Sequence, residues 1–199
     1  MATLNSSNPL VVEQNESGYR FSIESVLLAH FVSLPKNGRL LDVGTGCGII
    51  PFLLATRKKA KEIVAIEIQS SLYNLAVKNL SKNEQLKKVR LVHGDFINLK
   101  LNAISEPFDI IISNPPYQKL NTGRVNPNQE KAIARHELAI DLKSLTTRVH
   151  GCLKNRGIFT LTYPPIRLKE VLEQLLAHKL FSRRLLLFMA RRKRRPVAF

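Results

Sequence analysis

The sequence contains few cysteines and no long run of apolar residues. Its two cysteines, Cys47 and Cys152, stand far apart and form no CxxC pair, which argues against a disulfide framework and against a thiolate metal site. No apolar stretch approaches the roughly 20 residues that a membrane-spanning helix needs. The first residues hold neither a basic segment nor an apolar core, so no signal peptide is expected. These absences predict a cytoplasmic protein without a membrane span.

Acidic residues are scarce as well. The chain has 15 Asp and Glu against 31 Lys and Arg, which gives a formal net charge of +16 at pH 7. An excess of this size in a compact domain favours a polyanionic partner such as a nucleic acid, although a solubilising surface would give the same balance. The length of 199 residues and the hydrophobic content of 44% fit one globular domain with a sizeable core.

Strand-like and helix-like segments alternate along the chain. Short apolar runs predict strands over residues 39–43, 62–67, 89–92, 108–113 and 157–162. Helical periodicity follows over 49–55, from Ser70 onwards, over 142–153 and from Leu168 onwards. Alternating strand and helix units predict an α/β fold with a doubly wound, mostly parallel sheet.

The most informative motif, Asn114-Pro115-Pro116-Tyr117, directly follows the apolar run 108–113. Proline locks φ and lacks an N–H donor, so two prolines in a row make a stiff platform that leaves carbonyl oxygens as acceptors. Asn114 adds a side-chain oxygen and Tyr117 adds a flat ring. Acceptors beside a stacking ring suit a planar group that carries an NH₂, such as the exocyclic amine of a base.

Glycines and acids follow the ends of the other expected strands. The segment 42–48 contains GxGxG, in which glycines let a ligand approach the backbone, whereas the dinucleotide fingerprint would need glycine in place of Ile49. Glu67 lies about 20 residues further on, where an acid can bind ribose hydroxyls. Asp95 and Phe96 offer an acceptor and an apolar edge that suit an adenine ring. Ligands bind beyond the carboxyl ends of such strands, so we expect these residues to form one site.

With these motifs in this order, the chain resembles class I S-adenosylmethionine-dependent methyltransferases that carry an Asn-Pro-Pro-Tyr motif. Three further segments, 18–31, 123–127 and 132–138, make the resemblance more specific. They are similar to bacterial tRNA adenine-N6 methyltransferases that modify valine tRNA beside the anticodon. The similarity runs from about residue 11 to about residue 180, most of the chain.

This resemblance implies a domain organisation. Residues 39–199 would form a Rossmann-like methyltransferase domain, with residues 1–38 as an N-terminal lid or cap segment packed on the same domain. The family closes its sheet with an antiparallel hairpin. Here residues 185–190 would form a sixth strand and 196–199 would begin a seventh, so we expect a short or truncated hairpin with an open edge. We expect a monomer or a weak dimer.

The resemblance also implies S-adenosylmethionine as the cofactor. The residues expected to bind it are Tyr19, Phe21, Ser22, Asp42, Gly44, Thr45, Gly46, Gly48, Glu67, Ile68, Asp95, Phe96 and Asn114. Those expected to act in catalysis are Asn114, Pro115, Pro116 and Tyr117. Asn114 Oδ1 and the Pro115 carbonyl would accept the two protons of the adenine amine while Tyr117 stacks on the base. The predicted reaction is methyl transfer to N6 of an adenosine in tRNA, without a metal ion.

Other acceptors share this chemistry and stay open. Protein glutamine-N5 methyltransferases that act on release factors use the same motif, but they usually carry a longer helical N-terminal domain, and the charge of +16 favours RNA. Guanine N2 in ribosomal RNA and adenine in DNA also fit. A catalytically inactive RNA-binding module would require a damaged cofactor loop, and the glycine loop looks intact.

Overall fold

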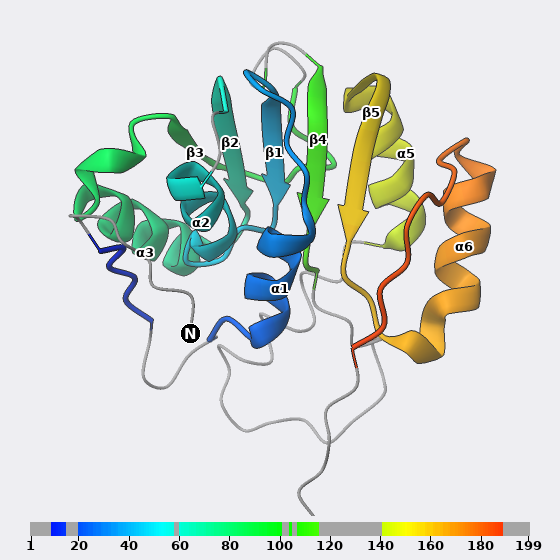
Figure 1. Cartoon of the computed structure of the whole chain (residues 1–199), viewed down its shortest axis with the longest axis horizontal. Helices are drawn as coiled ribbons and strands as arrows, with labels where there is room; N and C mark the ends of the chain where they lie inside the picture. The colour runs from blue at the N-terminus through cyan, green and yellow to red at the C-terminus, as the bar shows by residue number, and fades with distance from the viewer. Residues whose placement is uncertain are drawn as a thin grey trace, which may run out of the picture.

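The structure is a computed structural model that describes residues 9–14, 20–57, 60–100, 104, 107–115 and 141–188 (Figure 1). Its described strands form one five-stranded sheet in the order β3-β2-β1-β4-β5. Every neighbouring pair is parallel. The strands are β1 (Arg39–Val43), β2 (Glu62–Glu67), β3 (Val89–His93), β4 (Phe108–Ser113) and β5 (Leu153–Leu161). The expected parallel α/β architecture is confirmed.

Helices cover both faces of this sheet (Figure 1). The α-helices are α1 (Ile23–Phe31), α2 (Ile49–Arg57), α3 (Ser70–Ser81), α5 (Leu142–Cys152) and α6 (Leu168–Ala177), and the 3₁₀ turns are η1 (Glu84–Leu86) and η3 (Pro165–Arg167). The strand order reverses between β1 and β4, where one half of the sheet grows outwards through β2 and the other through β5. Such a switch point leaves a crevice at the carboxyl ends of the strands.

The core consists of one apolar cluster on each side of the sheet. Leu40 of β1 packs with α1 and α2 on one side, whereas Leu41, the next residue, packs with α5 on the other. Ile110 and Ile111 of β4 divide in the same way, because successive side chains of a strand point to opposite faces. A strand that is buried on both faces has no polar side, which explains why β1 and β4 appear in the sequence as continuous apolar runs.

The C-terminal region differs from the sequence-based expectation. β5 begins at Leu153 rather than at residue 157, and its pairing with β4 shifts register between Phe108 and Ile110. The expected sixth strand is wrong for residues 185–188, which have no regular secondary structure and expose their side chains. The guanidinium of Arg184 lies 4.3 Å from the ring centroid of Phe31, so this segment contacts α1.

The remaining C-terminal expectations are untested. The expected seventh strand, 196–199, lies outside the described residues. The expectation of a monomer or weak dimer stays a prediction.

Arg39 joins the amino-terminal ends of several strands. Its side chain is 4% exposed and forms an ion pair of 2.7 Å with Glu62 of β2. The guanidinium also donates to the carbonyl oxygens of Pro107 and Ile104 and lies 4.7 Å from the centroid of the Phe108 ring. A buried cation is tolerated when its donors are used in this way. Arg39 therefore connects β1 to β2 and to the start of β4.

We expect Arg39→Ala to lower the free energy of unfolding by about 2–4 kcal/mol, because it leaves Glu62 without its buried partner and two carbonyl oxygens without a donor. Arg90→Ala is the matched control, since Arg90 also pairs with Glu62 but is 41% exposed. It should cost below about 1 kcal/mol. Urea unfolding followed by circular dichroism measures both variants, and equal losses would contradict a central role for Arg39.

Candidate functional site

The loop between β1 and α2 forms the centre of the candidate site. Gly44, Gly46 and Gly48 have φ values of 75°, 60° and 92°, which bend the chain from the end of β1 into α2. A Cβ atom on Gly44 would meet no atom within 4 Å, whereas one on Gly48 would lie 2.5 Å from Cζ of Phe52. The two glycines therefore serve different purposes. Gly44 leaves the backbone open to a ligand, and Gly48 makes room for an aromatic ring of α2.

Glu67, at the carboxyl end of β2, braces this loop. Its Oε2 accepts a hydrogen bond of 2.7 Å from the Gly46 N–H, and its Oε1 accepts one of 2.9 Å from the Gln69 N–H. Burial raises the pKa of Glu67, and the backbone donors oppose that rise. A carboxylate oxygen accepts more than one hydrogen bond, so Glu67 keeps capacity for ligand hydroxyls. Ile68, the following residue, is 38% exposed at the same edge.

Asp42 and Thr45 are buried polar residues of the same loop region. Three of their side-chain atoms have no hydrogen-bond partner among the described residues. They are the two carboxylate oxygens of Asp42 and Oγ1 of Thr45. Burial raises the pKa of Asp42 to about 7, with the charge of Glu67 adding to the rise and the Thr45 hydroxyl opposing it. Buried polar atoms without partners are uncommon and mark a place for a bound polar group. A ligand with a cationic or donor end suits this position.

The end of β4 lies beside the glycine loop. Val43 of β1 pairs with Ser113 of β4. Gly44 directly follows Val43 and Asn114 directly follows Ser113, so the two segments leave the sheet side by side. Pro115, the next residue, is buried. The adjacency of β1 and β4 at the switch point thus brings the start of the Asn-Pro-Pro-Tyr motif to the loop, although the two segments are far apart in the sequence.

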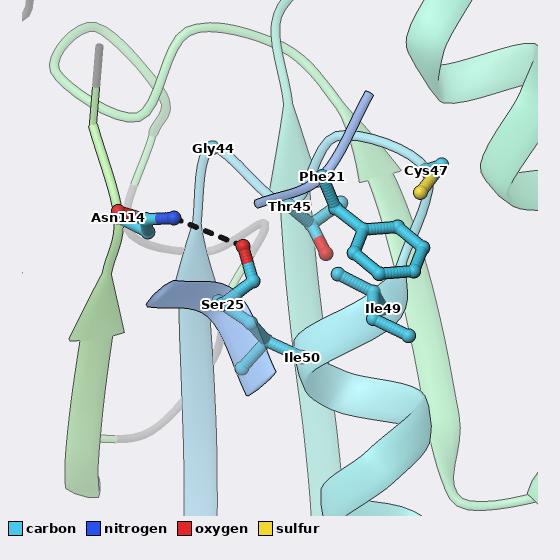
Figure 2. Close-up of a pocket in the computed structure, with 8 residues that line it drawn as sticks. All are labelled: Phe21, Ser25, Gly44, Thr45, Cys47, Ile49, Ile50 and Asn114. Atoms are coloured by element: carbon cyan, nitrogen blue, oxygen red, sulfur yellow. Dashed lines mark hydrogen bonds between the residues drawn. The ribbon is translucent and has the colours of Figure 1, made fainter. Parts of the chain in front are cut away.

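Residues from three parts of the chain enclose a pocket at this point (Figure 2). Its lining consists of Phe21, Ser25, Gly44, Thr45, Cys47, Ile49, Ile50 and Asn114. Asn114 Nδ2 donates a hydrogen bond of 2.9 Å to Ser25 Oγ, as Figure 2 shows. The N-terminal segment therefore contributes to the pocket directly. Burial raises the pKa of the Cys47 thiol to about 11, so this cysteine is a neutral lining residue at pH 7.

Asp95 and Phe96 follow the carboxyl end of β3. Asp95 Oδ1 accepts from the Ile97 N–H at 2.9 Å and Oδ2 accepts from Asn98 Nδ2 at 2.6 Å, so Asp95 caps the turn after β3. The Phe96 ring is 2% exposed and packs in the cluster that α5 covers, with the Arg148 guanidinium 5.9 Å from its centroid. The ring is thus part of the core, and the expectation that Phe96 borders a bound adenine stays a prediction.

Ser22 is an expected site residue that does not line this pocket. Ser22 precedes α1, where its Oγ donates to Glu24 Oε2 at 2.7 Å. Tyr19, Pro116 and Tyr117 lie outside the described residues.

No described helix is both long and apolar enough to cross a bilayer. Within the same ranges, no His, Cys, Asp and Glu side chains gather in a group of three that would hold a metal ion.

Sequence reasoning missed Ser25 as a pocket residue. Ser25 lies on the buried face of α1 together with Leu28 and Ala29, at positions i, i+3 and i+4. A small polar residue in an apolar helical stripe needs a hydrogen-bond partner, and that requirement was the available signal. Its partner could not be inferred, because Asn114 is distant in the sequence.

Residues 17–138 match the family model of the methyltransferase small domain. A tRNA1(Val) (adenine(37)-N6)-methyltransferase of Bacteroides thetaiotaomicron is 30% identical over 77% of this chain and 63% of its own length. The namesake from Flavobacteriaceae bacterium strain 3519-10 is 29% identical over the same shares. The chain thus spans about 63% of the length of these curated relatives.

Solved structures share the fold at low identity. A precorrin-6y C5,15-methyltransferase of Geobacter metallireducens is 14% identical with a TM-score of 0.60, over 84% of this chain and 76% of that chain. A precorrin-8w decarboxylase of Methanobacterium thermoautotrophicum is 18% identical with a TM-score of 0.60, over 83% of this chain and 77% of that chain. These similarities support the architecture of the sheet and its helices.

Alanine substitutions at Gly44 and Gly48 should separate the steric cost from the conformational cost in the free energy of unfolding. Gly48→Ala places a Cβ against the Phe52 ring at a positive φ, so we expect it to lower the free energy of unfolding by about 3 kcal/mol or more. Gly44→Ala meets open space and should cost about 1–2 kcal/mol, from its positive φ alone. Urea unfolding tests this order. A larger loss for Gly44→Ala would contradict the assignment of the two glycines.

The raised pKa of Asp42 predicts a pH-dependent stability. The unfolded chain loses the Asp42 proton near pH 3.8, whereas the folded chain keeps it up to about pH 7. The stabilisation is therefore complete below pH 3.8 and is lost as pH rises towards 7. Asp42→Asn stays neutral, so its free energy of unfolding relative to the parent should increase between pH 5 and pH 8.

Denaturant unfolding at pH 5 and pH 8 measures this difference. Asp109→Asn is the control, because the pKa of Asp109 is lowered, with its backbone and Lys154 donors outweighing desolvation. The difference in free energy of unfolding between Asp109→Asn and the parent should be the same at both pH values. An equally constant offset for Asp42→Asn would argue that the buried carboxyl is charged throughout.

Proposed function

Since the chain belongs to the methyltransferase small domain family, we propose that it transfers a methyl group from S-adenosylmethionine to the N6 amine of an adenosine in tRNA. The observation that carries the proposal is the position of Asn114 and Pro115 at the end of β4, beside the open glycine loop. The names of the curated relatives support adenosine 37 of a valine tRNA as the acceptor. A tRNA substrate would place the protein in the cytoplasm.

The residues of the glycine loop fit the amino-acid end of S-adenosylmethionine. This cofactor supplies an electrophilic methyl group on a sulfonium when it is bound. Gly44 lets a ligand reach the backbone, and the buried oxygens of Asp42 and Thr45 suit its ammonium group. Gly46 and Gly48 keep the loop in the shape that these contacts need. The fit therefore rests on open space and unpartnered acceptors in the same loop.

The neighbouring strand ends fit the nucleoside half of the cofactor. Glu67 accepts hydrogen bonds from two backbone N–H groups and retains lone pairs for ribose hydroxyls. We assign the adenine ring to the surface beside Ile68, Asp95 and Phe96, whose ring is 2% exposed. Phe21 covers the loop from the N-terminal segment, and we extend this cover to Tyr19 and Ser22.

Asn114 and Pro115 would activate the acceptor base. The amine of adenine is a poor nucleophile because its lone pair is delocalised into the ring. Accepting its two protons at Asn114 Oδ1 and at the Pro115 carbonyl favours a tetrahedral nitrogen as the new C–N bond forms. Proline contributes no N–H that would compete for these acceptors. We assign stiffening of the platform to Pro116 and base stacking to Tyr117.

The net charge of +16 supports a nucleic acid as the acceptor rather than a protein glutamine. Lys and Arg neutralise phosphates along a nucleic acid backbone, and this attraction is independent of base sequence. The charge therefore supports the class of acceptor, and the motif supports the atom that is methylated.

Transfer of radiolabel from S-adenosylmethionine tests the proposal. The acceptors are an in vitro transcript of valine tRNA with adenosine at position 37, the same transcript with guanosine there, ribosomal RNA, DNA and a release factor. We expect label in the first transcript alone. Asn114→Ala should reduce transfer by about 100-fold, as loss of one transition-state hydrogen-bonding group does, with a much smaller change in cofactor Kd.

Asn74→Ala is the matched control, because Asn74 is an exposed asparagine of α3. It should transfer at the parental rate. Label in the release factor alone would replace tRNA by protein as the acceptor. Cofactor binding without transfer to any acceptor would identify an inactive binding module.

A further inference from the structure

The first turn of α1 contacts the acceptor platform through a hydrogen bond. Ser25 is 3% exposed, and its Oγ lies 2.9 Å from Asn114 Nδ2 (Figure 2). The contact joins residues separated by 89 positions, so it depends on the folded arrangement of α1 and β4. Both residues line the pocket beside Gly44. Ser25 is therefore a neighbour of the group that we assign to the acceptor amine.

A side-chain amide has a donor end and an acceptor end on separate branches. In Figure 2 the nitrogen of Asn114 is turned towards Ser25, and its oxygen lies on the other branch. An amine with two protons is bound by the oxygen and repelled by the NH₂ end. The hydrogen bond to Ser25 uses one N–H of the amide and thereby restrains the plane of the side chain.

We propose that Ser25 is a positioning residue, which holds Asn114 in the orientation that presents its oxygen to a planar primary amine. This inference rests on the proposed function, because it assigns Ser25 an effect on the rate of methyl transfer. Ser25 acts through Asn114, and the proposal assigns it no role in cofactor affinity. The N-terminal segment then contributes to catalysis as well as covering the site.

The segment before α1 is anchored to α3 by a buried asparagine. Asn79 Oδ1 accepts from the Glu13 N–H at 2.9 Å, and Asn79 Nδ2 donates to the Glu13 carbonyl at 3.0 Å. The same nitrogen donates to the carbonyl of Cys47 in the glycine loop at 3.1 Å. Asn79 therefore fixes the N-terminal segment and the loop relative to each other.

A second asparagine, just beyond the end of α3, repeats the arrangement. Asn83 Oδ1 accepts from the Val11 N–H at 3.0 Å, and Asn83 Nδ2 donates to the Val11 carbonyl at 2.7 Å. Gln14 Oε1 then accepts from the Phe21 N–H at 3.1 Å, immediately before α1. These bonds connect α3, through residues 11–14, to the start of α1. They explain how Ser25 is held against the end of β4.

Substitution of Ser25 tests the proposal in the full chain. With the valine tRNA transcript as acceptor, Ser25→Ala should lower kcat about tenfold, the effect of losing one neutral hydrogen bond. The cofactor Kd and the KM for the transcript should change by less than about twofold, because the proposal has Ser25 act on the reaction through Asn114. Ser25→Thr keeps the hydroxyl and should retain most of the parental rate.

Two comparisons separate positioning from a structural role. Ser33→Ala removes an exposed serine just beyond α1 and should behave as the parent. In the Asn114→Ala background, Ser25→Ala should cause no further loss of rate, because its effect passes through Asn114. Thermal unfolding midpoints of all variants are measured alongside, and parental midpoints are expected.

The inference is overturned if Ser25→Ala transfers at the parental rate, or if its cofactor affinity falls as much as its kcat. It is also overturned if the losses from Ser25→Ala and Asn114→Ala multiply in the double variant. A parent chain that binds S-adenosylmethionine but labels no acceptor refutes the proposed function itself. A parent that labels the transcript, with Ser25→Ala at the same rate, refutes only the role of Ser25.

Discussion

The hydrogen bond from the Gly46 N–H to the Glu67 carboxylate connects the two halves of the candidate site. Gly46 belongs to the loop after β1, and Glu67 ends β2, so the bond closes the loop against its neighbouring strand. The N–H groups of Gly44 and Thr45 add bonds to the Ile66 carbonyl at the same place. Because these donors are directed towards β2, the outer face of Gly44 stays open. The position of the pocket follows from this closure.

The loop is held from its other side by Asn79, which contacts the Cys47 carbonyl. It therefore has a fixed shape although three of its glycines have positive φ. The burial of the Asp42 carboxyl near Glu67 is an unfavourable feature of the same region. The charge of Glu67 adds to the rise of the Asp42 pKa that burial causes. Packing on both faces of β1 compensates for this cost.

Much of this arrangement could be predicted from the sequence, for identifiable reasons. The runs that became β1, β2 and β4 are apolar because both faces of these strands are buried, and the glycine spacing reports the loop conformation directly. Residues 185–188 have the same apolar character, yet they form no strand, because strand formation needs a neighbour that the sequence does not reveal. Phe96 shows a similar limit, since its position beside Asp95 did not reveal which side of the sheet its ring faces. The partnership of Ser25 with Asn114 depends on three-dimensional contacts alone.

The attachment of residues 11–14 to α3 has a consequence for which positions of the protein can vary. Asn79 and Asn83 bind the backbone groups of Glu13 and Val11, as a neighbouring strand would. A backbone N–H and carbonyl are common to every residue type except proline, which lacks the donor. The docking is thus largely indifferent to the side chain at position 11, while it demands an amide at positions 79 and 83. Position 11 can therefore change its side chain and stay in place, whereas Glu13 and Gln14 also use their side chains, to pair with Lys78 and Lys82 and to bind the Phe21 N–H.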